Sequence, residues 1–308
     1  MTEQTGSVFA GRNALIYGGA KGIGRAVALE FALRGARVAV ADIDHTEAEH
    51  TAAMIVEGGG QAKAYRCDVT SDASVREVAE AAHAAFGEAD IVMNNVGGIL
   101  HGNPEDIPVA EWQRILDLNL MPVVRSNAVF LPKMLARGSG FIVNTASFAG
   151  LYPFATTRMP YVSAKAGVIA LSESLALYLE PQGIRVSCLI PGPVMTNVLD
   201  GMKTWTEGLE MRGPGSDLDL TTVDDVARTL ADGMEAGKIL IPTHDEAWAT
   251  MARHAADPDG FIRDKISEIE AGDYGKPRIP EAMLAAMKGR APTPSPSRLR
   301  EGNISTTN

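Results

Sequence analysis

Short apolar runs alternate with longer helical stretches along most of this 308-residue chain, and this alternation constrains the fold more than any other feature. The strand-like runs number seven and cover residues 13–17, 37–41, 62–67, 91–93, 141–144, 184–190 and 238–241. Strands that alternate with helices form parallel sheets, and near-continuous apolar runs are typical of strands buried on both faces. The chain is therefore predicted to be an α/β protein. It should have a doubly wound parallel sheet of about seven strands, with helices on both faces.

The domain organisation follows from the same pattern. Residues 12–242 are predicted to form one catalytic domain, preceded by an N-terminal tail (1–11). Residues 196–220 have weak periodicity and are long for a simple connection, so we expect a substrate lid there. Residues 243–288 form a C-terminal extension with helices expected at 248–255 and 280–287. Residues 289–308 are rich in Pro, Ser, Thr and Arg and are expected to be disordered.

Composition and charge exclude several classes of protein. The chain is 45% hydrophobic and 21% charged, as in ordinary globular proteins, and its net charge of −10 argues against a nucleic-acid partner. No long uncharged apolar window suggests a membrane span, and the polar N-terminus lacks a signal core, so a cytoplasmic location is expected. Cys67 and Cys188 are too few for a metal cluster or a disulfide framework, so we expect buried thiols and no metal.

A glycine-rich turn, Gly18-Gly19-Ala20-Lys21-Gly22-Ile23-Gly24, lies where the first strand meets the first helix. Free N–H groups and the helix dipole make such a junction a site for a pyrophosphate. Gly18 would let the chain turn, Gly22 would leave room for phosphates, and Gly24 would let the helix pack close to the sheet. The spacing differs from the G-x-G-x-x-G fingerprint. The alternative is a flexible loop that happens to be rich in glycine, and the strand-to-helix position disfavours it.

The residue that ends the second strand indicates which dinucleotide would bind. Asp42 is placed to accept hydrogen bonds from the adenosine ribose and to repel a 2′-phosphate, which favours NAD over NADP. Lys21 favours NADP, because a cation there could help to hold a 2′-phosphate. Asp42 could instead cap the next helix, although Asp44 is better placed for that. Further cofactor contacts are expected from residues near the ends of these strands: Ile23, Ile43, Asp68, Val69, Asn95, Val96 and Gly97.

A tyrosine and a lysine lie four residues apart in a helical segment, so Tyr161 and Lys165 should share one helix face. A nearby ammonium favours the phenolate and lowers the tyrosine pKa from about 10, toward the range useful for acid–base work. The lysine could also reach a ribose hydroxyl. The alternative is an ordinary amphipathic helix with a surface lysine and a half-buried tyrosine.

Two further polar residues accompany this pair. Ser147 follows the strand at 141–144, where open α/β sheets place their sites, and could donate to a substrate oxygen as charge develops. Its alternative role is a turn or helix cap. Asn119 is polar within an apolar helical stretch. It could hold a water beside the lysine, or it could be a buried amide that bends its helix.

In this order and spacing, the motifs resemble the short-chain dehydrogenase/reductase family, single-domain type, over residues 12–242. The resemblance is carried by the 18–24 turn and by Asp68-Val69, Asn94-Asn95-Val96-Gly97, Asn119, Ser147, Tyr161-x-x-x-Lys165 and Pro191-Gly192-Pro193-Val194-Met195-Thr196. It implies a Rossmann-like fold. The family's usual ending after the last strand is missing and is replaced by the extension.

The resemblance also implies roles. Tyr161 would be the general acid/base, Ser147 would orient the reacting oxygen, and Asn119 would complete a proton relay. Lys165 would lower the tyrosine pKa and bind the nicotinamide ribose. Cofactor contacts would also come from Pro191, Val194 and Thr196. In the family, the helical segments at 108–136 and 159–179 pair with their copies, which implies a homodimer or homotetramer.

The segment between Ser147 and Tyr161 lines the substrate pocket in the family. It contains Phe148, Tyr152 and Phe154, which suggest a hydrophobic or aromatic substrate. The alternative is that these rings only pack against the lid. Arg158, Lys203 and Arg212 are isolated in the sequence, so a strongly anionic substrate is not expected.

The sequence therefore predicts an oxidoreductase that interconverts a secondary alcohol and a ketone by hydride transfer to or from NAD. Its partner would be a small-molecule alcohol or ketone, not a nucleic acid or a membrane. One alternative is an NADP-dependent carbonyl reductase. Another, of a different class, is a non-catalytic nucleotide-binding scaffold, which would be expected to have lost one of Ser147, Tyr161 or Lys165.

Overall fold

The computed structural model describes residues 8–196, 202–281 and 283–284. In these ranges the predicted doubly wound parallel sheet is confirmed: seven strands lie in the order β3-β2-β1-β4-β6-β7-β9. The strands are β1 (Asn13–Tyr17), β2 (Arg37–Asp42), β3 (Gln61–Arg66), β4 (Ile91–Asn94), β6 (Gly140–Thr145), β7 (Ile184–Ile190) and β9 (Leu240–Pro242). The strand order reverses between β1 and β4. In such sheets ligands bind outside the carboxyl ends of the strands at that reversal.

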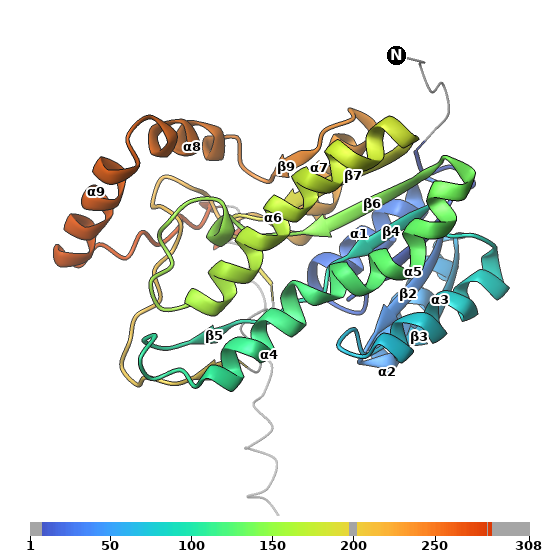
Figure 1. Cartoon of the computed structure of the whole chain (residues 1–308), viewed down its shortest axis with the longest axis horizontal. Helices are drawn as coiled ribbons and strands as arrows, with labels where there is room; N and C mark the ends of the chain where they lie inside the picture. Colours follow the sequence, from blue (N-terminus) through green and yellow to red (C-terminus); the bar gives the residue numbers. More distant parts are fainter. Residues whose placement is uncertain (1–7, 197–201, 282, 285–308) are drawn as a thin grey trace, which may run out of the picture.

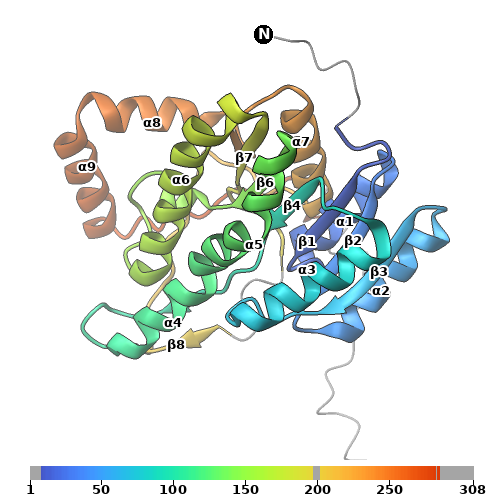
Figure 2. The same cartoon turned by 45° about the vertical axis from the view of Figure 1, so that its right-hand side comes forward.

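Helices cover both faces of the sheet (Figures 1 and 2). The helices of the described ranges are α1 (Gly22–Leu33), α2 (His45–Glu57), α3 (Asp72–Phe86), α4 (Val109–Asn119), α5 (Met121–Arg137), α6 (Met159–Leu179), α7 (Val223–Glu235), α8 (Glu246–Ala256) and α9 (Pro258–Glu270). Of these, α8 and α9 lie beside the sheet and not on its faces. A small separate sheet pairs β5 (Leu100–His101) with β8 (Lys203–Thr204), which lies in the predicted lid. The sequence pattern did not predict α9, β5 or β8.

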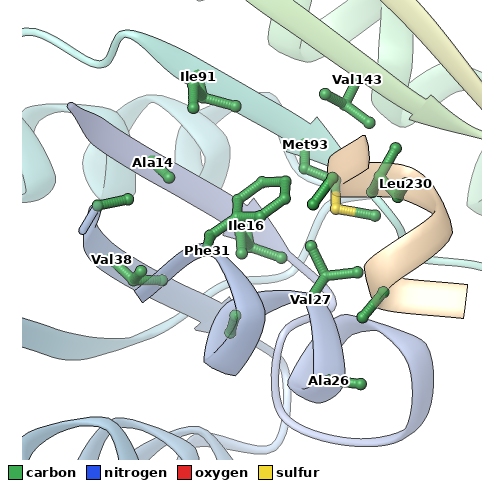
Figure 3. Packing of buried hydrophobic residues seen from close by; sticks show 14 of the residues in the cluster. Ala14, Ile16, Ala26, Val27, Phe31, Val38, Ile91, Met93, Val143 and Leu230 are labelled. Atoms are coloured by element: carbon green, nitrogen blue, oxygen red, sulfur yellow. The ribbon is translucent and has the colours of Figure 1, made fainter. Parts of the chain in front are cut away.

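Two apolar cores lie on opposite faces of the sheet because side chains alternate along each strand. From β1, Ile16 packs into a core with Val27 and Phe31 of α1 and Leu230 of α7, as Figure 3 shows. Leu15, the neighbour of Ile16, is buried in a second core with residues of α3, α5 and α6. Strands buried on both faces are the physical reason for the near-continuous apolar runs in the sequence.

The predicted long helical segment 108–136 is two helices. α4 ends at Asn119 and α5 begins at Met121, with Leu120 between them. Pro122 lies in the first turn of α5. A proline fits a first turn but cannot donate the backbone hydrogen bond that a helix interior needs. The apolar periodicity continues across the junction, which is why it did not reveal the break.

The described end of the expected N-terminal tail (1–11) packs against the domain. Phe9 is fully buried, its ring lies 4.7 Å from that of Phe31, and the guanidinium of Arg34 lies 5.7 Å from its ring centre. Residues 8–11 are therefore packed against α1. A single phenylalanine in a polar stretch gives no periodic signal, so the sequence did not predict this contact.

The C-terminal extension packs against the predicted lid. Figure 1 shows α8 and α9 on the opposite side of the molecule from α2 and β3. After α9 the chain returns along the lid: the Leu220 N–H donates to the Arg278 carbonyl at 2.7 Å, and the Arg278 N–H donates to the Leu218 carbonyl at 2.8 Å. The Arg278 guanidinium also pairs with Asp219 at 2.8 Å. These bonds fix residues 218–220 of the lid to the extension.

Two sequence predictions for the C-terminal part extend beyond the described residues. Of the helix expected at 280–287, the start is seen as a turn in which the Leu284 N–H donates to the Pro280 carbonyl at 3.0 Å. Residues 282 and 285–287 lie outside the description. So does the whole segment 289–308 that was expected to be disordered.

Within the described ranges, one helix is long and apolar enough to cross a membrane by length and composition, Met159–Gln182. It carries Tyr161 and the buried Lys165, and it packs against the sheet. Core helices of soluble proteins pass the same test, so we assign no membrane span to it.

Candidate active site

A cleft of about 720 Å³ opens at the carboxyl ends of the central strands, where the strand order reverses. Of the residues predicted to bind the cofactor, these line it: Gly18, Lys21, Gly22, Ile23, Asp42, Ile43, Asp68, Val69, Asn95, Val96, Gly97, Tyr161, Lys165, Pro191, Val194 and Thr196. Ser147 lines the same cleft. The fold thus brings the glycine turn and the Ser–Tyr–Lys set to one place.

The glycine turn is shaped by close backbone contact. A Cβ atom on Gly24 would lie 1.8 Å from the carbonyl oxygen of Gly18, so α1 can approach β1 this closely only with glycine at that position. Gly18 has a φ of 75°, which favours glycine. Lys21 precedes α1, and among the described residues its side chain makes no cap bond to the first-turn N–H groups. Those groups face the cleft as hydrogen-bond donors for an anion.

Asp42 is held in place by the backbone of the same region. Its two carboxylate oxygens accept from the N–H groups of Ala20 at 3.1 Å and Asp44 at 3.0 Å. Asp44 caps α2 by accepting from the Glu47 N–H, as the sequence predicted. Asp44 also pairs with the Lys21 ammonium at 2.8 Å, and this hydrogen bond raises the pKa of Lys21. The cation that could favour NADP therefore already has an acidic partner.

Asn95 links the glycine turn to the catalytic strand. Its amide nitrogen donates to the Gly18 carbonyl at 3.1 Å, and its amide oxygen accepts from the Thr145 hydroxyl at 3.0 Å. The Thr145 carbonyl in turn accepts from the Lys165 ammonium at 2.8 Å. Asn95 therefore has a supporting role in the cleft, in addition to any contact with a ligand.

Lys165 and Tyr161 lie on one face of α6, with the ammonium 5.7 Å from the centre of the tyrosine ring. Lys165 is 3% exposed, and burial lowers its pKa to about 8. Burial raises the pKa of Tyr161, while a hydrogen bond with Ser147 and the charge of Arg158 lower it. The sequence predicted that Lys165 would lower the pKa of Tyr161, but Lys165 is not among the groups that shift it. The Ser147 hydrogen bond and Arg158 are the groups that favour the phenolate here.

Asn119 lies just behind the cleft wall and does not line it. Its amide oxygen accepts from the Gly98 N–H at 3.2 Å, and its amide nitrogen donates to the carbonyls of Gly98 at 3.0 Å and Ile115 at 2.9 Å. The hydrogen bond to Ile115 lies within α4. This bond agrees with the alternative that Asn119 is a buried amide bonded to its own helix. A Cβ on Gly97 would lie 2.7 Å from the Asn119 oxygen and 3.2 Å from the Lys165 nitrogen, so glycine separates the two groups.

The aromatic residues expected to contact substrate are buried instead. Phe148, Tyr152 and Phe154 are 1%, 4% and 6% exposed, and none of them lines the cleft. Tyr152 packs against Phe261 of α9, with ring centres 6.4 Å apart, and all three rings share a core with Leu218 of the lid. The three rings therefore pack against the lid, which was the alternative to contact with a substrate. Gly24 likewise supports the cleft from behind and does not line it.

Positively charged residues that looked isolated in the sequence gather at the cleft. Arg158, Arg114 and Lys203 all line it, although they come from three separate segments. Arg114 and Lys203 both pair with Glu111, at 2.7 and 3.1 Å. Sequence reasoning missed Arg158 as a site residue. The available signal was its position three residues before Tyr161, where the helix begins.

Comparison with known proteins agrees with this geometry. The family model for short chain dehydrogenases matches residues 12–207. The chain belongs to this family. This short-chain dehydrogenase is 35% identical over 196 residues to the 7alpha-hydroxysteroid dehydrogenase of Escherichia coli, covering 63% of this chain and 75% of that protein. It is 35% identical over 192 residues to the cyclohexanol dehydrogenase of an Acinetobacter species, covering 62% and 76%.

The fold of this short-chain dehydrogenase is similar to that of a solved family member from Burkholderia phymatum in complex with NAD. The TM-score is 0.71 at 27% identity, and the likeness covers 87% of this chain and 97% of the other. The family model ends at residue 207, so α7, β9 and the extension with α8 and α9 follow the matched region.

Proposed function

We propose that this short-chain dehydrogenase oxidises a secondary alcohol to a ketone, reversibly, with NAD as the hydride acceptor. The observation that carries the proposal is the convergence of Ser147, Tyr161 and Lys165 on the same cleft as the glycine turn. A non-catalytic scaffold would have no need of a serine hydrogen-bonded to a half-buried tyrosine beside a buried lysine.

The cleft fits a nicotinamide dinucleotide. The first turn of α1 offers backbone N–H groups to a pyrophosphate, and Asp42 offers carboxylate oxygens to a ribose. Ile23 and Val69 would lie beside the adenosine half, and Pro191, Val194 and Thr196 would hold the nicotinamide half. When bound, NAD supplies the two-electron acceptor for the alcohol carbon.

The side chains supply the proton chemistry. Tyr161 removes the hydroxyl proton of the alcohol, or returns it in the reverse direction, and Ser147 hydrogen-bonds the same oxygen. Burial opposes ionisation of Tyr161, and the Ser147 hydrogen bond and the positive charge of Arg158 offset part of that cost. Lys165 is held by the Thr145 carbonyl, from where its ammonium can reach a ribose hydroxyl. Asn119 fixes the backbone of Gly98 next to these groups.

NAD is favoured over NADP by the charges around Asp42. A 2′-phosphate would meet the Asp42 carboxylate, and the nearby Lys21 ammonium is already paired with Asp44. Both effects favour an unphosphorylated ribose.

A hydrophobic, cyclic secondary alcohol is the substrate class that the cleft and the relatives support. Apolar side chains of Ile99, Leu118 and Met202 line the cleft. Two of the relatives are named for cyclic alcohols, cyclohexanol and a hydroxysteroid.

We also propose a homodimer or homotetramer and a cytoplasmic location. Two free, buried cysteines support the cytoplasmic location.

A panel of alcohols tests the proposal. Purified protein would be mixed with NAD or NADP and with cyclohexanol, 1-phenylethanol, a hydroxysteroid, 2-butanol and a primary alcohol, and reduced cofactor would be followed by absorbance. We expect turnover of cyclic or aryl secondary alcohols with NAD, and little with the primary alcohol. Absence of NAD-dependent turnover, together with absence of ketone reduction by NADH, would contradict it.

A further inference from the structure

Arg158 occupies a position with direct access to the reaction. It immediately precedes α6 as its N-cap residue, three residues before Tyr161, and it lines the cleft together with Tyr161 and Ser147. The positive charge of Arg158 acts on Tyr161 and lowers the pKa of its hydroxyl. A substrate whose hydroxyl reaches Tyr161 therefore lies in the same cleft as Arg158.

The guanidinium of Arg158 is largely withdrawn from water, and its contacts are neutral. Its Nη2 donates to the backbone carbonyl of Arg212 at 2.6 Å, and the group lies 5.7 Å from the centre of the Phe154 ring. Its Nε is buried and has no hydrogen-bond partner among the described residues. Within the described part of the chain, no carboxylate forms an ion pair with it. The titratable neighbours that face it are Tyr161 and His101, and neither is an acid that would be ionised at neutral pH.

Three other cations of this region have acidic partners, and Lys165 is held by the Thr145 carbonyl at 2.8 Å. Arg212, the most buried arginine nearby, pairs with Glu268 at 2.8 Å, and Arg114 and Lys203 share Glu111. A partly desolvated cation normally has a counter-charge, because desolvation without one is costly. Arg158 lacks one within the described residues and faces the space where substrate would lie.

We propose that Arg158 binds an anionic group of the substrate, so that the preferred alcohols carry a carboxylate a few bonds from the hydroxyl carbon. The inference rests on the proposed function, because it places the carboxylate next to the carbon that is oxidised. A planar guanidinium suits a carboxylate, with which it forms two parallel hydrogen bonds. One guanidinium carries one positive charge, which suits a carboxylate better than a doubly charged phosphate. This proposal differs from the sequence expectation that a strongly anionic substrate is unfavourable.

A pair of substrates that differ only in charge tests the proposal. The probes are 3-hydroxycyclohexanecarboxylate and its carboxamide, which share the ring and the hydroxyl. We expect wild-type kcat/KM to be at least about tenfold higher for the acid, as one charge-assisted hydrogen bond would give. Arg158→Met should bring the ratio close to one, and Arg158→Lys should keep part of it. A change in Tyr161 acidity would slow both probes alike and leave the ratio unchanged.

Arg137→Met is the matched control. Arg137 also donates to backbone carbonyls, those of Ser139 and Ala89, but it lies outside the cleft. Its replacement removes the same charge from the protein and should leave the acid-to-amide ratio as in the wild type. A similar drop of the acid-to-amide ratio in both variants would mean that the overall charge of the protein sets the preference for the acid. That result would overturn the role of Arg158.

A binding measurement separates this proposal from the proposed function. Calorimetry would compare cyclohexanecarboxylate with cyclohexanecarboxamide on the NADH-loaded protein, with no turnover needed. Tighter binding of the carboxylate that is lost in Arg158→Met supports the anion site even if neither alcohol is oxidised. Equal binding of the two probes, or a difference that survives in Arg158→Met, overturns it even if neutral alcohols are oxidised well.

Discussion

The side chain of Asn119 holds the backbone of Gly98 at both polar atoms, with its amide oxygen 3.2 Å from the Gly98 nitrogen and its amide nitrogen 3.0 Å from the Gly98 oxygen. Gly97 and Gly98 both line the cleft. Asn119 is buried at the end of α4, so the break between α4 and α5 also fixes one wall of the cleft. This arrangement gives Asn119 a positioning role that does not depend on a bound water.

Asn119→Leu should therefore weaken both stability and cofactor binding. The substitution leaves the N–H and carbonyl of Gly98 without their partner, which costs about 1–3 kcal/mol for each buried group left unsatisfied. Urea unfolding and NAD titration would measure the two effects. Asn127→Leu is the control, because Asn127 is buried in α5 but its amide oxygen has no partner in the described structure. Equal loss of NAD affinity in both variants would contradict the positioning role.

Tyr161→Phe should abolish most of the activity while leaving the cofactor site intact. The ring is kept, but the proton-transferring hydroxyl is removed, so the rate should fall at least about a hundredfold. Steady-state turnover and NAD binding by fluorescence would check this. Tyr178→Phe on the same helix is the control, because Tyr178 is 59% exposed at the other end of α6. Near-normal turnover of the Tyr161 variant would exclude this residue as the base.

Lys165 should make folding stability depend on pH. Its pKa in the folded protein is about 8, below its ordinary value of 10.5, so the unfolded chain binds more protons between these values. Lys165 therefore lowers the free energy of unfolding below pH 8. This destabilisation decreases as the pH rises from 8 to 10.5.

Lys165→Met removes this dependence. Without cofactor, the variant should be more stable than the wild type near pH 7 by up to a few kcal/mol, given about 1.4 kcal/mol per pH unit of displaced pKa. Its advantage should shrink between pH 8 and pH 9.5. Chemical unfolding at pH 7.0, 8.5 and 9.5 would measure it, and an advantage that grows with pH would contradict the depressed lysine pKa.

Asp42 should determine cofactor choice. Wild-type kcat/KM should be higher with NAD than with NADP, and Asp42→Ala should narrow the gap by weakening NAD and relieving the repulsion of the 2′-phosphate. Hydrogen bonds to a charged group contribute about 1.5–3 kcal/mol each. Asp42→Asn removes the charge with little change in shape. It therefore separates the repulsion of the 2′-phosphate from the loss of the hydrogen bonds to Ala20 and Asp44. If the wild type prefers NADP, Lys21 outweighs Asp42.

The exposed faces of α5 and α6 predict self-association. Val124 on α5 is 42% exposed, and Leu177 and Tyr178 on α6 are 82% and 59% exposed. We expect at least a homodimer in light scattering at micromolar concentration. Leu177→Asp should shift it toward the monomer, whereas Leu33→Asp on α1, where Leu33 is 83% exposed, should not. A wild-type monomer would contradict the prediction.

Local patterns in the sequence were sufficient to predict the sheet and the position of the glycine turn. The apolar runs became strands because both faces are covered, and the glycine turn lies between β1 and α1. Asp44 was expected as a helix cap from its neighbours alone, and it is one. Each of these features depends on residues close together in the chain or on a repeated pattern.

The positions of Tyr152 and Arg158 depend on contacts between distant segments, so the sequence alone did not predict them. Tyr152 is buried because Phe261, more than a hundred residues later, packs against it. Arg158 lines the same cleft as Arg114 and Lys203, and Lys203 belongs to β8, which pairs with the distant strand β5. Neither relationship leaves a periodic trace in the sequence.

The backbone bonds between the lid and residues 274–278 also set an order of events during synthesis. A ribosome completes the glycine turn, Tyr161 and Lys165 well before it makes Arg278. The emerging chain can therefore form its glycine turn and α6 before Leu218 and Leu220 can bond to the extension. The contacts that hold the lid are among the last that this fold gains as it is made.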